Sequence, residues 1–486
     1  MSRRGSPLRR CAALALLPAL LAACSLNPAT GKRQLSFFGE EAELAMGAEA
    51  DGEIVQTVGL YDDPDLAAYV EQLGQRLAAT SERPYLPWSF KVLDDPTVNA
   101  FALPGGYVYV TRGILTHLSS EAELGGVLGH EIGHVTARHG VNQMSKHLLV
   151  TAGLVVAAAA DPDLEDWAFV ASAGMGLLFL HYGRDDERQA DDLGLRYMTR
   201  AGLDGRQLPE VFSVLQGVQT VEGTGWLPSW LASHPDPGAR RHRIEEQLAA
   251  AGVPGDGSVV GRESYLARLD GMVFGEDPRD GYFEGRDFLH PEFAFRLRFP
   301  AGWTTANQAR AVSAVSPGED AAIQVSLAAE ATADAAAERF FAEEGIERGS
   351  SAERTVHGLP AVWTSFEVAG DVTTADDDLE GRVVFLTHRG RLFELLGLAR
   401  AEGGTDAGDL EDALGSFTPL TDPEALAVEP RRVKLVTLSE AMTLARFQEL
   451  HPSTVSIELL ALINHVQPGD TLKAGALVKR VVGGAR

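Results

Sequence analysis

The sequence predicts an α+β protein built from several domains. Its 486 residues exceed the usual size of a single domain. The first half carries apolar residues at helical spacing, whereas residues 286–420 alternate apolar and polar residues in the manner of half-buried strands. With 45% hydrophobic and 23% charged residues, the composition is that of a globular protein.

The first 23 residues have the layout of a secretory signal. Basic residues precede an apolar run, Cys11–Ala23, that is too short to span a bilayer as a stable helix. The run ends in LLAAC, Leu20–Cys24, which resembles the lipobox of bacterial lipoproteins. This resemblance implies that Cys24 is acylated, and Ser25 after it implies an outer-membrane lipoprotein that faces the periplasm. An ordinary secretory signal cleaved nearby is the alternative.

Charge and cysteine content narrow the possible partners and sites. The formal net charge of −26 argues against a nucleic-acid partner, because phosphate binding needs a basic face. The two cysteines are Cys11, inside the signal, and Cys24. The mature chain therefore forms no disulfide, and any metal must be held by His, Asp or Glu.

Residues 24–255 are predicted to form a mainly helical domain with a small sheet. Helices are expected over Glu40–Ile54 and Asp65–Ala79. A Pro104-Gly105-Gly106 turn then precedes a strand, Tyr107–Thr111. If this strand lies at an exposed sheet edge, an extended peptide can pair with it, which makes Gly106, Tyr107, Val108 and Tyr109 candidate substrate-binding residues. An interior strand is the alternative.

The stretch LGHEIGHVTARHG, Leu128–Gly140, lies on a predicted helix. Ser120 and Glu123 fit a capping box at its start, and Gly140 is the expected stop. The helix also contains several glycines, which are poor helix formers, so another backbone or a substrate is expected to approach it closely. They are Gly125, Gly126, Gly129 and Gly133.

The HExxH pattern within this helix predicts a zinc site. His130 and His134 share one helix face and can both reach one ion. Glu131 then lies beside the open position of the metal, where it can act as general base for a zinc-activated water. A helix that carries two histidines by chance is the alternative.

A catalytic zinc usually needs a third protein ligand. The extended HExxHxxGxxH pattern fails, because Ala137 and Gly140 hold the required glycine and histidine places; His139 is interpreted as a surface or helix-end histidine. Glu187 is the candidate ligand, with Asp191 four residues later placed to accept an imidazole N–H. From the residues alone, a solvated charged helix face remains the stronger interpretation of this stretch.

The motifs together resemble the zinc metallopeptidases of family forty-eight, the gluzincins of the HtpX, Oma and BepA type. HEIGH followed by Arg184-x-x-Glu187-x-x-Ala190-Asp191 carries the resemblance, as do VNAFALPGGYVYVTRGIL and NPATGKRQLSFFGEEAELAMGAEA. It covers roughly residues 25–250. It implies a zincin-like peptidase fold and one Zn²⁺ per chain, with Glu187 as third ligand and Glu131 as base.

The segment SHPDPGAR, Ser233–Arg240, resembles a further motif of this family. The resemblance implies that His234 is either a fourth ligand that latches the site or a stabiliser of the tetrahedral oxyanion. A loop histidine before proline is the alternative. The extra basic run of Arg240, Arg241 and Arg243 departs from the pattern.

Two apolar runs, Leu148–Ala160 and Trp167–Leu180, are each too short to cross a membrane. Buried core helices are the favoured interpretation, and a hairpin that dips into lipid or guards the site is the alternative.

The remaining sequence is divided into a linker, 256–285, an α+β accessory domain, 286–420, and a strand–helix–helix–strand segment, 431–482. The end of this last segment resembles the second half of a LysM peptidoglycan-binding module, with Asn464 and Gly475 in place. LSEAMTL stands where the first half of such a module has a G-D-T-L turn, so the module is degenerate.

The leading hypothesis is a periplasmic zinc endopeptidase that hydrolyses misfolded or misassembled envelope proteins. One alternative is a chaperone or assembly factor for outer-membrane proteins with a latched, mostly inactive site. Another is a protein that anchors to peptidoglycan through residues 431–482.

Overall fold

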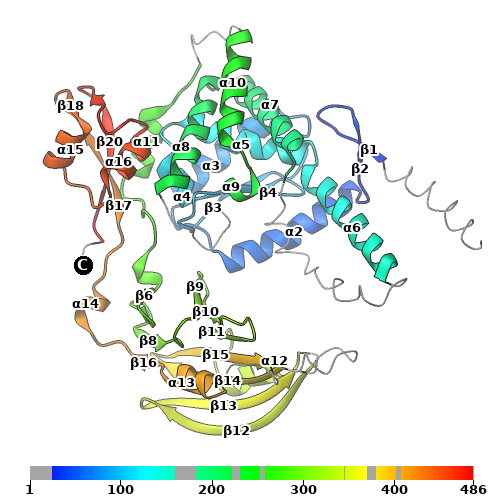
Figure 1. Ribbon diagram of the computed structural model, residues 1–486, viewed down its shortest axis with the longest axis vertical. Coiled ribbons are helices and arrows are strands. Elements are labelled where there is room, and N and C mark those ends of the chain that lie inside the picture. Colours follow the sequence, from blue (N-terminus) through cyan, green and yellow to red (C-terminus); the bar gives the residue numbers. More distant parts are fainter. Residues whose placement is uncertain are drawn as a thin grey trace, which may run out of the picture. The chain divides into compact units, whose positions relative to one another are not determined.

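The computed structural model describes residues 24–158, 182–221, 230–251, 258–343, 345–368, 379–400 and 407–484 (Figure 1). The chain divides into two compact units. Unit 1 comprises Met1–Met272 and Val433–Val482, and unit 2 comprises Val273–Arg432 and Gly483–Arg486. Unit 1 is mainly helical and unit 2 is largely β with an antiparallel sheet, which confirms the predicted α+β multidomain class.

Unit 1 begins with a small hairpin, and helices then surround a three-stranded sheet (Figure 1). The elements up to residue 272 are β1 (Cys24–Leu26), β2 (Arg33–Leu35), α2 (Glu40–Thr57), α3 (Pro64–Ala78), β3 (Ser89–Leu93), β4 (Ala100–Leu103), β5 (Tyr107–Thr111), α4 (Arg112–His117), α5 (Glu121–Thr136), α6 (His139–Ala158), α7 (Arg184–Arg200), α8 (Leu208–Val221), α9 (Trp230–Ser233), α10 (Pro237–Ala251) and α11 (Arg262–Leu269).

Strand β5 is the central strand of this sheet, so the prediction of an exposed edge over Tyr107–Thr111 is wrong. It pairs with β3 in parallel and with β4 in antiparallel fashion. Val108 and Tyr109 are buried, and the Tyr109 hydroxyl donates to Asp51. Gly106 lies in the turn before the strand, at φ 106°. Since both edges of β5 are occupied, a peptide cannot add to it, and β4 is an outer strand.

Helix α5 carries the HEIGH sequence and begins as predicted. The Ser120 hydroxyl accepts from the Glu123 N–H, and the Glu123 carboxylate accepts from the Ser119 N–H at 2.6 Å. Its end differs from the prediction, because the helix stops at Thr136 rather than at Gly140. Arg138 adopts φ 60°, a left-handed conformation that cannot continue a right-handed helix, and α6 starts at the next residue.

The glycines of α5 allow helix α7 to pack against it at backbone distance, as predicted. A Cβ built at Gly129 would lie 3.0 Å from the Gly194 carbonyl oxygen, and one at Gly133 would lie 3.0 Å from that of Ala190. Gly194 in turn faces the backbone of His130. This close packing brings the acidic residues of α7 directly over the histidines of α5.

The segment from residue 433 packs on the helices of unit 1 that precede residue 272 through polar contacts. It contains β17 (Arg432–Thr437), β18 (Met442–Thr443), α15 (Leu444–Leu450), α16 (Ile457–Asn464), β19 (Thr471–Leu472) and β20 (Leu477–Val482), and β17 pairs with β20. The buried Lys479 ammonium donates to the carbonyls of Thr116 and Leu118 at 3.0 and 2.7 Å. The segment thereby caps the carbonyl end of α4. Glycan binding by it stays a prediction.

The structure differs from the predicted linker over residues 256–285. Helix α11 lies in this range and buries Tyr265, Leu266 and Leu269. The Tyr265 hydroxyl donates to the Leu115 carbonyl at 2.7 Å, which ties α11 to α4. Residues 258–272 are therefore part of the packed unit 1.

Unit 2 contains a seven-stranded antiparallel sheet, β12-β13-β14-β15-β11-β10-β9, and a four-stranded sheet, β16-β8-β7-β6 (Figure 1). Its core is rich in aromatic side chains such as Phe295, Phe393 and Phe417. The elements are β6 (Tyr282–Glu284), β7 (Asp287–His290), β8 (Phe295–Arg298), β9 (Thr304–Asn307), β10 (Ala311–Val315), β11 (Ala321–Leu327), α12 (Ala333–Phe340), β12 (Ile346–Val356), β13 (Leu359–Val368), β14 (Leu379–His388), β15 (Arg391–Arg400), α13 (Ala407–Gly415), β16 (Thr418–Pro419) and α14 (Pro423–Leu426).

Two predictions fall wholly outside the described residues. The signal sequence, 1–23, is one of them, and the apolar run Trp167–Leu180 is the other. Most of the run Leu148–Ala160 forms the last turns of α6. Within the described parts of the chain, no helix is both long enough and apolar enough to cross a membrane.

Candidate metal centre

Helix α5 supplies two buried imidazoles that face the same point. His130 and His134 are one helical turn apart, and their Nε2 atoms lie 3.0 Å from each other. Both side chains are 2% exposed. Because the Nε2 atoms converge, the two rings offer adjacent ligand positions to a single ion.

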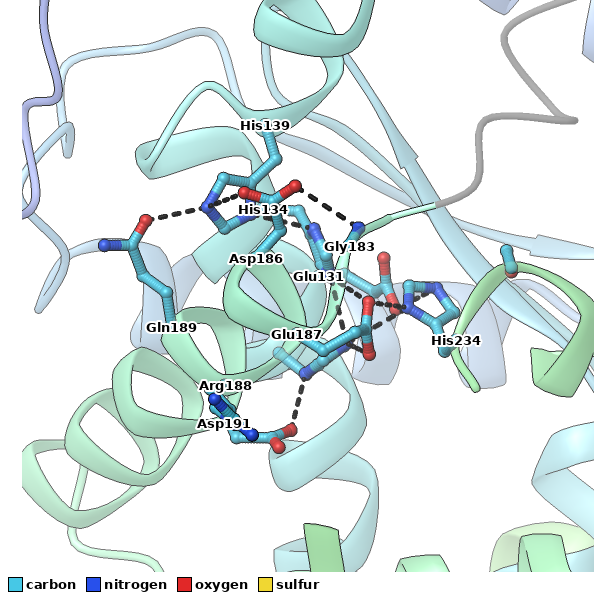
Figure 2. A network of polar contacts seen from close by, with 12 residues as sticks. Glu131, His134, His139, Gly183, Asp186, Glu187, Arg188, Gln189, Asp191 and His234 are labelled. Carbon is cyan, nitrogen blue, oxygen red and sulfur yellow. Dashed lines mark hydrogen bonds and ion pairs between the residues drawn. The ribbon is translucent and has the colours of Figure 1, made fainter. Parts of the chain in front are cut away.

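Helix α7 places a carboxylate against both imidazoles (Figure 2). Glu187 Oε1 lies 3.4 Å from His134 Nε2, and Glu187 Oε2 lies 3.7 Å from His130 Nε2. Burial alone would raise the pKa of Glu187, but His234, His134 and Arg240 hold it well below its usual range. Glu187 is therefore ionised and able to bind a cation.

His234, directly after α9, completes the cluster. Its Nδ1 atom lies 2.8 Å from Glu187 Oε1 and 3.4 Å from His130 Nε2. The side chain is 1% exposed, and its ring stacks on Trp230 at 4.5 Å between centroids. His234 thus lies at the fourth corner of the site, not in an exposed loop.

The geometry of these four residues fits Zn²⁺. Their ligand atoms all lie within 4.8 Å of one another. A tetrahedral zinc with ligand distances of ~2.0–2.1 Å has ligand atoms about 3.4 Å apart. Five of the six pairs of ligand residues have atoms 2.8–3.7 Å apart, which scatters around that value. Nitrogen and carboxylate donors are the ligands that zinc takes where no cysteine is present.

Asp191 and Arg240 form the layer behind the ligands. Asp191 Oδ1 lies 3.1 Å from His130 Nδ1, so it can hold that ring with Nε2 toward the metal. The Arg240 guanidinium contacts Asp191 Oδ1 at 2.6 Å and Glu187 Oε2 at 2.7 Å. Although burial opposes ionisation of Asp191, Arg240 and His130 lower its pKa to about 2. The Arg240 guanidinium thus lies against both Glu187 and Asp191 and offsets part of their buried negative charge.

His139 lies at a helix end, as predicted, but it is buried rather than at the surface. It is the first residue of α6 and only 1% exposed. Its Nδ1 atom lies 3.0 Å from His134 Nδ1, on the side of that ring away from the other ligands. Burial, with His134 nearby, lowers the pKa of His139 to about 3, so its ring is neutral at physiological pH.

Glu131 lies beside the cluster and points to the α9 segment. Its Oε1 atom accepts a hydrogen bond from Trp230 Nε1 at 3.3 Å and lies 3.7 Å from His234 Nε2. Burial raises the pKa of Glu131 to about 7. A carboxyl group with such a pKa can both take up and release a proton near neutral pH.

Comparison with known proteins assigns this site to a family. The sequence profile of peptidase family M48 matches residues 64–248. The chain is 31% identical to the mitochondrial metalloendopeptidase OMA1 of Schizosaccharomyces pombe over 229 residues. These residues are 46% of this chain and 67% of that protein. The chain belongs to peptidase family M48. The resemblance seen in the sequence is thereby confirmed at the level of the family, as is the His130, His134 and Glu187 zinc-site geometry.

Other relatives of this M48 chain share the same region. Mitochondrial metalloendopeptidase OMA1 of Arabidopsis thaliana is 32% identical over 235 residues, which are 47% of this chain and 45% of that protein. The beta-barrel assembly-enhancing protease of Yersinia pestis is 28% identical over 231 residues, which are 46% of this chain and 47% of that protein. The chain thus spans about half the length of these two relatives.

Three residues of the M48 site were not assigned a role from the sequence. Arg240 stood in a basic run without an evident partner, Trp230 lay outside any motif, and His139 was one position early for the extended pattern. For Arg240 the sequence offers one local indication of a role in the site. It lies six residues after His234, on the face of α10 that meets α7. Nothing in the sequence pattern connects Trp230 or His139 to the metal.

Proposed function

We propose that the chain is a zinc-dependent endopeptidase with Glu131 as its general base. The observation that carries this proposal is the buried cluster of His130, His134 and Glu187 with a second carboxyl group, that of Glu131, beside it. A purely structural zinc site has no use for such a base beside its ligands.

Zinc held by these ligands supplies Lewis acidity toward a water molecule and the scissile carbonyl. Glu131 takes a proton from the attacking water and passes it to the leaving amine, which a carboxyl with a raised pKa does efficiently near neutral pH. Asp191 and His139 each contact the Nδ1 atom of one ligand histidine and so keep both Nε2 atoms directed at the ion.

We propose that the substrate binds along the outer edge of strand β4. Among the described residues, β4 pairs only with β5, so its other edge has unpaired backbone groups. Ala102 and Leu103 of β4 line the same small pocket as His134 and Tyr182. A substrate in extended conformation could therefore hydrogen-bond to β4 and pass in front of the metal ligands. Such backbone pairing favours unfolded chains and depends weakly on sequence.

Envelope proteins that have failed to fold or assemble are the proposed substrates. The name of the Yersinia pestis relative, a beta-barrel assembly-enhancing protease, supports this class. We further propose that Cys24 carries the lipid anchor predicted from LLAAC, which would hold the enzyme on the periplasmic face of the outer membrane.

Metal removal tests the proposed activity. We expect zinc-loaded protein to cleave an unfolded substrate such as reduced casein, a chelator to stop the cleavage, and added Zn²⁺ to restore it. Cleavage would be followed by gel electrophoresis and mass spectrometry of the fragments. A protein that contains one zinc per chain and leaves unfolded substrates intact would contradict the proposal.

A latched site is the second candidate, and His234 is the observation that favours it. Its Nδ1 atom occupies the fourth corner of the metal cluster, and neighbouring Trp230 donates to Glu131. In this arrangement the α9 segment blocks both the open metal position and the base. Such a chain would act mainly as an assembly factor until a partner displaces α9.

Substituting His234 by alanine distinguishes a latch from an oxyanion stabiliser. If His234 is a latch, we expect the variant to cleave casein several-fold faster and to bind zinc more weakly, because a ligand is lost and the fourth position is free. His242→Ala is the control, since that histidine also lies near the site in sequence but is 74% exposed. A loss of activity of about 10²–10³-fold would assign His234 to transition-state stabilisation instead.

A further inference from the structure

We propose that the N-terminal hairpin, β1 and β2, is a positioning element of the metal site, acting through Asn27, Gln189 and His139 on the ligand His134. This inference rests on the proposed zinc centre and adds that the position of the hairpin regulates metal binding there. The four side chains form a continuous series of hydrogen bonds from the hairpin to the metal cluster. Figure 2 shows the inner part of this series, with His139 between His134 and Gln189.

The first contact joins the two imidazoles. His134 Nε2 faces the other ligands, so in the metal-bound form the proton of this ring is on Nδ1. His139 Nδ1 lies 3.0 Å from that atom and must accept the proton's hydrogen bond. His139 consequently carries its own proton on Nε2.

The second contact uses that proton. His139 Nε2 lies 2.7 Å from Gln189 Oε1, which is an acceptor, so the direction of donation continues outward from the metal. Gln189 is on α7, two residues after the ligand Glu187. The tautomer of each histidine and the donor or acceptor role of each atom agree along the whole series.

The third contact attaches the hairpin. Asn27 Nδ2 donates to the same Gln189 Oε1 at 3.1 Å, so two donors converge on one oxygen and fix the orientation of the amide. Asn27 is 5% exposed and is itself held by the turn. Its Oδ1 accepts from the N–H groups of Ala29 and Thr30, and its own N–H donates to the Lys32 carbonyl at 2.7 Å.

The hairpin therefore places the last hydrogen-bond donor in a series that orients a metal ligand. Groups that hydrogen-bond to ligand histidines typically change metal affinity by about 10–100-fold when removed. Asn27 lies three residues after Cys24, the proposed point of lipid attachment. Movement of this segment would thus be transmitted to His134 through three hydrogen bonds, and docking of the hairpin would favour the metal-binding orientation.

Zinc affinity of the full chain tests this inference without relying on activity. We expect His139→Ala to weaken zinc binding by about 10–100-fold, measured by competition with a chromophoric chelator. Asn27→Ala and Gln189→Leu should weaken it in the same direction, by about tenfold. Each variant should also alter the visible absorption spectrum of the Co²⁺-substituted protein, which reports ligand geometry.

Two further variants separate this role from a general effect on folding. Gln189→Glu keeps an oxygen that accepts from both Asn27 and His139, so we expect it to retain near-wild-type zinc affinity. Thr30→Ala changes the same turn without touching Gln189 and should also leave affinity unchanged. Wild-type zinc affinity and Co²⁺ spectra in both Asn27→Ala and Gln189→Leu would overturn the inference. A wild-type chain that binds no zinc would overturn the metal centre itself and this inference with it.

Discussion

Replacing Glu131 by glutamine should lower the turnover number on an unfolded protein by about 10²–10⁴-fold while zinc stays bound. Glutamine has the same shape and keeps an oxygen that can accept from Trp230, so the packing around it is preserved. It cannot take a proton from water, and that step is the role proposed for Glu131. Turnover on casein and zinc content, measured on the same preparation, give both halves of the result.

Glu121→Gln is the matched control, because Glu121 is on the same helix but contacts Tyr69 and Arg76 rather than the metal ligands. We expect it to retain wild-type turnover. If Glu131→Gln cleaves casein as fast as the wild type, Glu131 is not the base. If instead neither the variant nor the wild type cleaves, binding surfaces and not hydrolysis account for the function.

Replacing Glu187 by alanine should remove zinc from the purified protein. Glu187 is the one carboxylate among the four clustered ligands, and its loss leaves three imidazoles beside the buried guanidinium of Arg240. In the variant, a bound Zn²⁺ and the Arg240 guanidinium would repel each other, because the Glu187 carboxylate would no longer lie between them. Elemental analysis after dialysis should find one zinc per chain in the wild type and far less in the variant.

Asp185→Ala provides the comparison on the same helix, since the Asp185 side chain is 95% exposed and lies two residues before Glu187. That variant should keep its zinc. Stoichiometric zinc in Glu187→Ala would assign the third ligand to another residue, with His234 the first to consider.

The metal helix is the part of the molecule that local sequence predicts best. The i, i+4 spacing of His130 and His134 is a property of any α-helix, and the Ser120 cap is satisfied by a residue three positions away. The glycines of α5 also predicted that another backbone or a substrate approaches this helix closely, and the structure shows that α7 is that neighbour. Glu187 could be assigned only through resemblance to a family, since charge alone does not distinguish a ligand from a solvated residue.

Features that depend on distant partners were not predictable in this way. The alternation in Tyr107–Thr111 predicts a strand but is silent about which strands lie on either side of it, and β5 turned out to be central. The position of His139 at a helix end was predictable, but its burial was not. Its burial depends on α7, which supplies Gln189 from fifty positions further along the chain.

The cap that Lys479 places on α4 also has a consequence for the order in which the molecule can be completed. The carbonyl of Thr116 and the ammonium that satisfies it are 363 positions apart in the chain. At synthesis rates of about 5–20 residues per second, Lys479 is made roughly 20–70 s after helix α4. Throughout that interval the carbonyls of Thr116 and Leu118 lack the partner that later buries them. The packing around α4 is therefore completed only after Lys479 has been synthesised.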